Sequence, residues 1–326
     1  LSAANTYTGL TTVSSGSTVV VSANASLGAS STGTTINSGG AVNVSGTGLS
    51  IAEPFNVSGT GISTAGAIRN VSGSGSNTIS GAITLGADSS IASDAGTLTF
   101  DVSSGNAFSG TYGLTFAGVG DTAVADPIAT GTGTLTKSGS GTLTLSGANT
   151  YTGGTTISAS GGGITISGAG SLATGSYSGA ISLGASTTFT YASSSNQTLS
   201  GVISGAGAVT KNVGTSTLTL AGSNTYTGLT TVSTGVVAIS TNTSLGDNGS
   251  SRSSTSVANG AAIGVSGGLT GITEPISILA WAPVDLEMES FLAQHINCVI
   301  YHLLFELFTS QHKVMRKSFC GRSEEH

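Results

Sequence analysis

A short motif, Asn-Thr-Tyr-Thr-Gly, occurs three times in this chain, at residues 5–9, 149–153 and 224–228. Each copy follows a leucine that lies four residues before its asparagine, and each is followed by Thr-Thr and a β-branched residue: Val13, Ile157 or Val232. A degenerate fourth copy at residues 106–110 keeps the asparagine, an aromatic residue and the glycine. Units that repeat in this way must stack on one another to bury their apolar sides, so the chain is predicted to be a repeat protein.

A longer repeat contains the short one. Residues 1–57 reappear at about 220–278, and residues 80–87 resemble residues 178–185. The distances between the three short motifs, 144 and 75 residues from their numbering, are unequal. The repeats therefore carry insertions, which indicates a solenoid with loops of variable length.

Apolar residues alternate with Ser and Thr along most of the chain. Leu143 and Leu145 alternate with Thr142 and Thr144, and Leu218 and Leu220 alternate with threonines in the same way. Alternation with a period of two predicts half-buried strands, and threonine is a polar residue that favours extended backbone. The chain has 51 glycines, only 7% charged residues and a mean hydropathy of +0.29, which argues against a disordered Gly/Ser linker.

These features predict an all-β chain, and we favour a parallel β-helix with irregular repeats over a β-sandwich. Turns of roughly 20–25 residues would give about a dozen rungs, and at ~4.8 Å per rung the rod would be ~60 Å long.

Residues 141–157, with the lead-in at 133–140, resemble the autotransporter-associated β-strand repeat, which is also called the passenger-associated transport repeat. Residues 214–245 and 1–28 resemble it as well, and with the intervening repeats the resemblance covers nearly all of residues 1–278. It implies a right-handed β-helical passenger of a bacterial autotransporter, located outside the cell or on its surface. It also implies an outer-membrane β-barrel translocator as the partner in the full-length protein, and the chain is interpreted as a fragment of that protein.

We expect the motif residues to be structural. The asparagines suit turn positions, and the tyrosines are expected to pack against the neighbouring rung. The candidate residues are Asn5, Tyr7, Gly9, Asn149, Tyr151, Gly153, Asn224, Tyr226 and Gly228.

The composition changes at about residue 279. All four histidines, both cysteines, both methionines and the only tryptophan lie beyond residue 278. We interpret residues 279–326 as non-native sequence that follows a reading-frame slip or an assembly junction. Read as genuine sequence, residues 286–309 have the periodicity of a short helix. His295, Cys298, His302 and Glu306 would share one side of it, but a single helix rarely forms a closed metal site.

Residues 1–278 lack the groups that common catalytic sites need. They contain no histidine for a Ser-His-acid triad and no cysteine for a thiol nucleophile. Asp88, Asp94 and Asp101 are the densest group of acids, and on successive strands they would approach one another on one face. This group supports the alternative of an extracellular carbohydrate-active β-helix enzyme, whereas the simpler interpretation is three turn residues.

The net charge of −6 argues against nucleic acid as a partner. We therefore predict a structural, surface-exposed passenger stalk that is not an enzyme and uses no cofactor or metal. Its repeats are expected to aid export and folding. Adhesion to host or matrix glycans or proteins is a further hypothesis.

Overall fold

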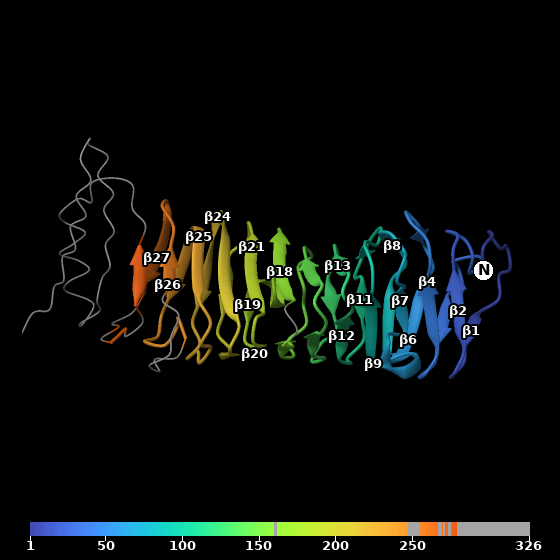
Figure 1. Ribbon diagram of the computed structural model, residues 1–326, viewed down its shortest axis with the longest axis horizontal. Coiled ribbons are helices and arrows are strands. Elements are labelled where there is room, and N and C mark those ends of the chain that lie inside the picture. Colours follow the sequence, from blue (N-terminus) through green and yellow to red (C-terminus); the bar gives the residue numbers. More distant parts are fainter. Residues whose placement is uncertain (160–161, 247–254, 267–268, 270, 273–274, 279–326) are drawn as a thin grey trace, which may run out of the picture.

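The computed structural model describes residues 1–159, 162–246, 255–266, 269, 271–272 and 275–278. These residues form a parallel β-solenoid, a rod in which the chain winds through about 11 turns (Figure 1). Every strand pair in the described ranges is parallel and joins neighbouring turns. The predicted parallel β-helix is confirmed, and the alternative of a β-sandwich is wrong because its sheets would be antiparallel. The predicted helix at 286–309, like the whole segment 279–326, lies outside the described residues.

Each turn passes through three faces of the rod. The first face consists of β1 (Thr11–Val13), β3 (Thr34–Ile36), β6 (Phe55–Gly59), the start of β9 (Ile83–Ser93), β11 (Phe108–Ser109), β14 (Ile128–Ala129), β19 (Ser176–Tyr177), β22 (Gln197–Leu199), the ends of β24 (Ala208–Leu220) and β25 (Thr230–Ile239), and β27 (Ala261–Val265).

The second and third faces are built in the same way. The second face consists of β2 (Thr18–Val21), β4 (Ala41–Val44), β7 (Ile68–Asn70), the end of β9, β12 (Leu114–Ala117), β15 (Leu135–Lys137), β17 (Thr155–Ile157), β20 (Ile181–Leu183) and β23 (Ile203–Gly205). The third face consists of β5 (Ser50–Ile51), β8 (Asn77–Ile79), β10 (Thr97–Phe100), β13 (Asp121–Val124), β16 (Thr142–Leu145), β18 (Gly163–Gly168), β21 (Thr188–Ser193), the starts of β24 and β25, β26 (Thr255–Val257) and β28 (Ile276–Ile278).

Corners join the faces in several ways. β9, β24 and β25 bend around a corner without a break, whereas η1 (Ile62–Thr64) and η2 (Ala173–Gly175) are short 3₁₀ turns. Corners also differ in length, because Leu135 pairs with Thr155 after 20 residues but Phe55 pairs with Ile83 only after 28. The inserted residues predicted from the unequal repeat distances therefore lie at the corners.

The core is a single column of inward side chains along the rod axis. Leu143, Leu145, Leu218 and Leu220 are each 0% exposed, so the predicted inward register of these strands is confirmed. Side chains from all three faces meet at the centre of the rod. Near its middle these are Phe100, Phe108 and Phe116, whose ring centroids are 4.9 to 6.1 Å apart.

Candidate functional site: the repeated corner motif

The three copies of the motif lie on three different faces of the rod. Residues 5–9 take the place of a strand on the third face and lead into β1 on the first face. Residues 149–153 lie on the first face, where Thr150 N–H donates to Ile128 O at 3.0 Å, and they lead into β17 on the second. Residues 224–228 lie on the second face, against β23, and lead into β25 on the third. The same sequence thus forms a corner at each of the three edges of the solenoid.

The motif asparagine connects successive turns through its side-chain amide. Asn149 Oδ1 accepts from Ile128 N–H in the preceding turn at 2.9 Å, and its Nδ2 donates to Ser171 O in the following turn at 3.0 Å. Asn224 repeats both contacts, with Ile203 N–H at 2.8 Å and Ser244 O at 2.6 Å. One buried side chain therefore holds three consecutive turns in register.

Asn5 makes one half of this contact. Its Nδ2 donates to Ser26 O in the following turn at 2.6 Å. The carbonyl acceptor in every copy is a serine followed by leucine, at residues 26, 171 and 244. The predicted role of the asparagines, as turn residues alone, was incomplete because the contacts between turns could not be read from the motif itself.

The motif tyrosine is fixed by a threonine four residues later in the sequence. The hydroxyl–hydroxyl distances are 2.8 Å from Tyr7 to Thr11, 3.0 Å from Tyr151 to Thr155 and 2.5 Å from Tyr226 to Thr230. The first threonine of the Thr-Thr pair is therefore part of the motif, a role that the strand pattern alone did not reveal.

Burial of the tyrosine differs among the copies. Tyr151 is 0% and Tyr226 1% exposed, whereas Tyr7 is 40% exposed. The predicted packing of the ring against the neighbouring rung is seen for Tyr151, which meets the Tyr177 ring edge-on with centroids 5.7 Å apart. Burial raises the pKa of the Tyr151 hydroxyl and raises that of Tyr177 to about 12.

The motif glycine allows two turns to approach closely. A Cβ added at Gly153 would overlap the carbonyl oxygen of Gly133, and one at Gly228 would overlap that of Gly207. At Gly9 the same Cβ would meet nothing within 4 Å. Neither Gly153 nor Gly228 has positive φ, so the requirement for glycine there is steric.

The degenerate fourth copy keeps only part of this arrangement. Phe108 is buried in the core, whereas Asn106 is exposed and its side chain makes no hydrogen bond to any described residue. Asn106 therefore does not connect turns. The only feature that the fourth copy has in common with the buried copies of the motif is a buried aromatic ring.

Two lysine side chains are buried in the core of the rod, and the sequence analysis did not single them out. Lys137 is 1% exposed and its Nζ donates to Ser138 O at 2.7 Å and Gly139 O at 2.8 Å. Lys211 is 0% exposed, donates to Val213 O and lies 5.7 Å from the centre of the Tyr191 ring. Lys137 lies two positions after the inward residue Leu135, and Lys211 lies two positions after the inward residue Val209. Because strand side chains alternate, the pattern predicts that both lysines point inward.

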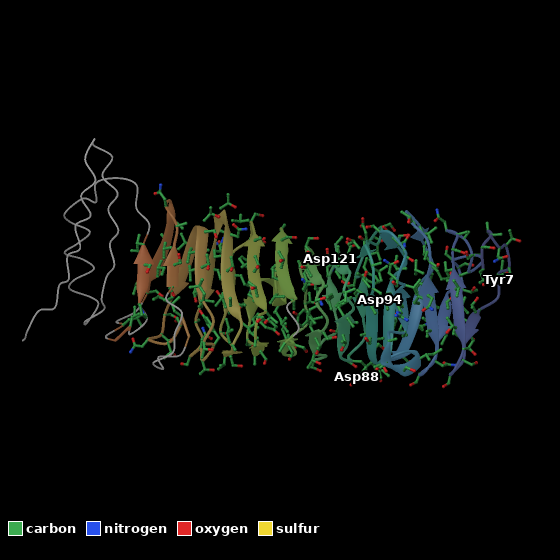
Figure 2. All side chains as sticks on the ribbon, viewed as in Figure 1. Tyr7, Asp88, Asp94 and Asp121 are labelled. Carbon is green, nitrogen blue, oxygen red and sulfur yellow. The ribbon has the colours of Figure 1, made fainter. Side chains whose placement is uncertain are left out.

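The aspartates proposed as an enzyme site are not brought together. Asp88 lies where β9 bends, Asp94 follows β9 and Asp101 follows β10, so they occupy three corners of one turn. Figure 2 shows Asp88 and Asp94 well apart from each other. Asp88 Oδ1 accepts from Gly113 N–H at 2.7 Å, and Asp94 pairs with Arg69. The expected approach on one face is wrong, because these strands lie on successive faces of one turn and do not stack. Asp94 lies in the bend between β9 and β10, as the turn interpretation expects, whereas Asp88 lies within β9 itself.

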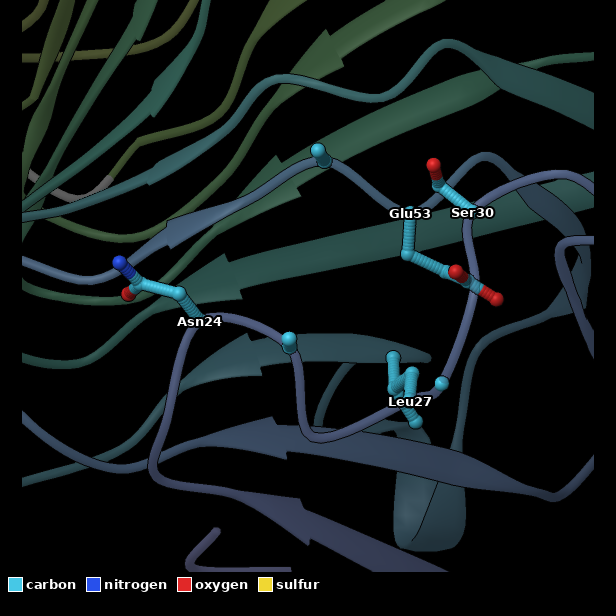
Figure 3. A pocket seen from close by; sticks show the side chains of 7 residues that line it. Asn24, Leu27, Ser30 and Glu53 are labelled. Carbon is cyan, nitrogen blue, oxygen red and sulfur yellow. The ribbon is translucent and has the colours of Figure 1, made fainter. Parts of the chain in front are cut away.

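A hollow of about 120 Å³ opens beside Glu53 near the N-terminal end of the rod (Figure 3). The Glu53 carboxyl is buried and accepts from Thr34 Oγ1 at 2.7 Å, and burial raises its pKa. The Asn24 side chain points away from it and accepts from Ser50 N–H at 3.0 Å. The hollow therefore lacks the converging polar groups of a binding site.

The described ranges hold no group of three or more His, Cys, Asp or Glu side chains suited to a metal ion. In the same ranges, no helix has the length and apolar character needed to span a membrane.

Comparison with known families identifies the corner unit. The sequence model of the Passenger-associated-transport-repeat family matches residues 1–21, 135–159 and 213–239. Each match contains one copy of the corner motif and the strand that follows it. No curated protein and no solved structure matches the chain.

Proposed function

Because this chain is a passenger-associated transport repeat protein, we propose that it forms the stalk of a bacterial autotransporter passenger, exposed at the cell surface or secreted. Its partner would be the outer-membrane β-barrel that translocates the passenger. The role proposed is structural and non-enzymatic, with the repeats aiding export by the way they fold. Adhesion to surface glycans or proteins would be a further role of the same stalk.

The observation that carries this proposal is the connection of three turns by one asparagine. Asn149 and Asn224 each bind the turn before and the turn after their own. A chain that emerges extended through a pore must form its turns one after another outside the membrane. We call this asparagine, with its hydrogen bonds to the turns before and after it, a clamp. Each clamp would let a newly folded turn stabilise the turns next to it, so that folding outside the cell opposes return of the chain through the pore.

The test places the chain between a signal peptide and a translocating barrel and measures the amount that reaches the outside. Leu143 and Leu145, changed together to Asp, should reduce export because each buries an unpaired charge and destabilises the rod by several kcal/mol. The matched control changes the outward Thr142 and Thr144 of the same strand to Asp. Similar export of both variants would contradict the proposal that folding drives export.

A further inference from the structure

The turn between β26 and β27 contains the sequence Asn259-Gly260, near the C-terminal end of the rod (Figure 1). Ala261 N–H donates to Ala258 O at 3.0 Å and closes the turn. Gly260 has a φ of 79°, whereas Asn259 does not have positive φ, which is the pattern of a type II turn with glycine at its third position. Among the described residues this is the only asparagine that glycine follows, and a second Asn-Gly pair, at residues 248–249, lies outside them.

Asn259 and Gly260 are both exposed to solvent. The Asn259 side chain makes no hydrogen bond to any described residue. The Gly260 N–H likewise donates to no acceptor in the described part of the chain. A Cβ added at Gly260 would meet nothing within 4 Å. The amide carbon of Asn259 and the backbone nitrogen that follows it are therefore both accessible for reaction.

We propose that Asn259 is a site of spontaneous self-modification, in which the Gly260 backbone nitrogen displaces the side-chain amide. After this nitrogen loses its proton to base in the solvent, it attacks Asn259 Cγ. The new N–Cγ bond closes a succinimide ring, the Cγ–Nδ2 bond breaks, and ammonia leaves. Water then opens the ring at either carbonyl, which gives aspartate or isoaspartate without oxidation or reduction. Glycine favours the ring closure because it has no Cβ to obstruct the attack and its backbone is permissive.

No other described asparagine combines these features. The clamp residues Asn149 and Asn224 are buried, and both ends of their side-chain amides are hydrogen-bonded to neighbouring turns. Asn24 and Asn196 are exposed, but each accepts a backbone N–H of the next turn and precedes a residue that carries a Cβ. The fold thus protects these amides and leaves that of Asn259 open to attack.

Asn106 provides a comparison within the same chain. Like Asn259, it is exposed and its side chain makes no hydrogen bond to any described residue. The residue that follows it is Ala107, which is buried and carries a Cβ. The two asparagines therefore share their exposure and differ in the residue that must attack, so Asn106 should keep its amide much longer.

Isoaspartate changes the geometry of this turn, because it places one additional atom in the main chain between Ala258 and Ala261. Ala258 N–H donates to Val232 O in the preceding turn, and the pairing of β27 with β25 begins at Ala261 and Gly235. The additional atom lies between these two points of attachment and disturbs the hydrogen bond that closes the turn. The modification should therefore loosen β27 from β25, and it adds a negative charge at this corner.

Incubation of the full chain at physiological temperature, at neutral and at mildly alkaline pH, tests the reaction. Trypsin cleaves after Arg252 and so separates Asn259 from the Asn-Gly pair at 248–249. Mass spectrometry of the peptides should show that Asn259 loses its amide several-fold faster than Asn106. The loss should be faster at the higher pH, because the attacking nitrogen must first lose its proton.

Both aspartate and isoaspartate should form at this position, as measured by peptide fragmentation and by labelling with an isoaspartyl methyltransferase. Loss of the amide without any isoaspartate would overturn the proposal, because it would mean direct hydrolysis without a succinimide. An Asn259 that keeps its amide as long as Asn106 does would overturn it as well.

Two variants then separate the altered backbone from the added charge. Asn259→Gln prevents the reaction over the same period, because the larger ring that glutamine would form closes more slowly. Asn259→Asp adds the charge without lengthening the main chain. Hydrogen exchange of the β27 amides should become several-fold faster in the incubated wild type, and it should stay unchanged in incubated Asn259→Gln and in fresh Asn259→Asp. Equal exchange in the incubated wild type and incubated Asn259→Gln would contradict the loosening of β27. The inference concerns a single turn, so its failure would leave the proposed export role intact.

Discussion

Lys137 occupies, one turn earlier, the register position of Ile157 in the core of the rod. Lys211 stands in the same relation to Val232. In both cases the later residue is the β-branched position that follows the motif, and the residue one turn before the lysine is aromatic, Phe116 or Tyr191. The buried ammonium groups donate to backbone carbonyls one or two residues further along the chain, where it turns a corner.

The buried lysines should make stability depend on pH. Burial lowers the pKa of Lys137 to about 8 and also lowers that of Lys211. The folded state disfavours the charged form, so the free energy of unfolding should rise as the pH increases from about 8 to 9.5. Measurements stop there because the buried tyrosines would act in the opposite direction at higher pH.

Chemical denaturation at several pH values measures this rise. Lys137→Met should be more stable than the wild type at pH 7 and should show a smaller rise with pH. An unchanged slope in this variant would mean that the pH dependence arises elsewhere.

Replacing a clamping asparagine should be costly. Asn149→Ala removes hydrogen bonds to two neighbouring turns and leaves Ile128 N–H buried and unsatisfied. At ~1–3 kcal/mol for each orphaned buried group, the loss should be about 2–4 kcal/mol. Asn106→Ala, in the degenerate copy, should change stability by less than about 0.5 kcal/mol. Urea denaturation of both variants makes the comparison, and equal losses would refute the clamp.

The hydroxyl of the motif tyrosine should contribute less to the free energy of unfolding than the asparagine does. Its contribution should be larger where the tyrosine is buried. Tyr151→Phe removes the hydrogen bond to Thr155, which keeps a second partner in Tyr177 at 2.8 Å. We expect a loss of about 1 kcal/mol, because a typical net contribution is ~0.5–1.5 kcal/mol. Tyr7→Phe, at an exposed site, should lose less. A larger effect at Tyr7 than at Tyr151, measured by denaturation, would contradict this assignment.

The glycine of the motif should tolerate substitution only where no turn lies against it. Gly153→Ala forces the carbonyl of Gly133 away and should lower the thermal unfolding midpoint. Gly9→Ala meets open space, so its midpoint should remain close to that of the wild type. Calorimetry of the two variants provides the measurement, and a Gly153→Ala protein of unchanged midpoint would show that the turns adjust freely.

Local alternation in the sequence determined which side chains point inward. Leu143 and Leu145 were predicted to be buried because strand side chains alternate with a period of two, and the same parity applies to Leu135 and Lys137. The repeated motif likewise determined the solenoid, since units of this kind bury their apolar sides only by stacking. Both signals act within a few residues, so they can be read without knowledge of the fold.

Only the tertiary structure decided which residues meet across turns. Corners of different length change the number of residues in a turn from 20 at Leu135 to 28 at Phe55. Distances in sequence therefore do not convert into whole turns, and this is why the three motifs lie on three faces. For the same reason Asp88 and Asp94 lie at different corners of one turn, and Asn149 finds its partners in Ile128 and Ser171. Register between turns is set by hydrogen bonds between segments about 20 residues or more apart, which no local pattern specifies.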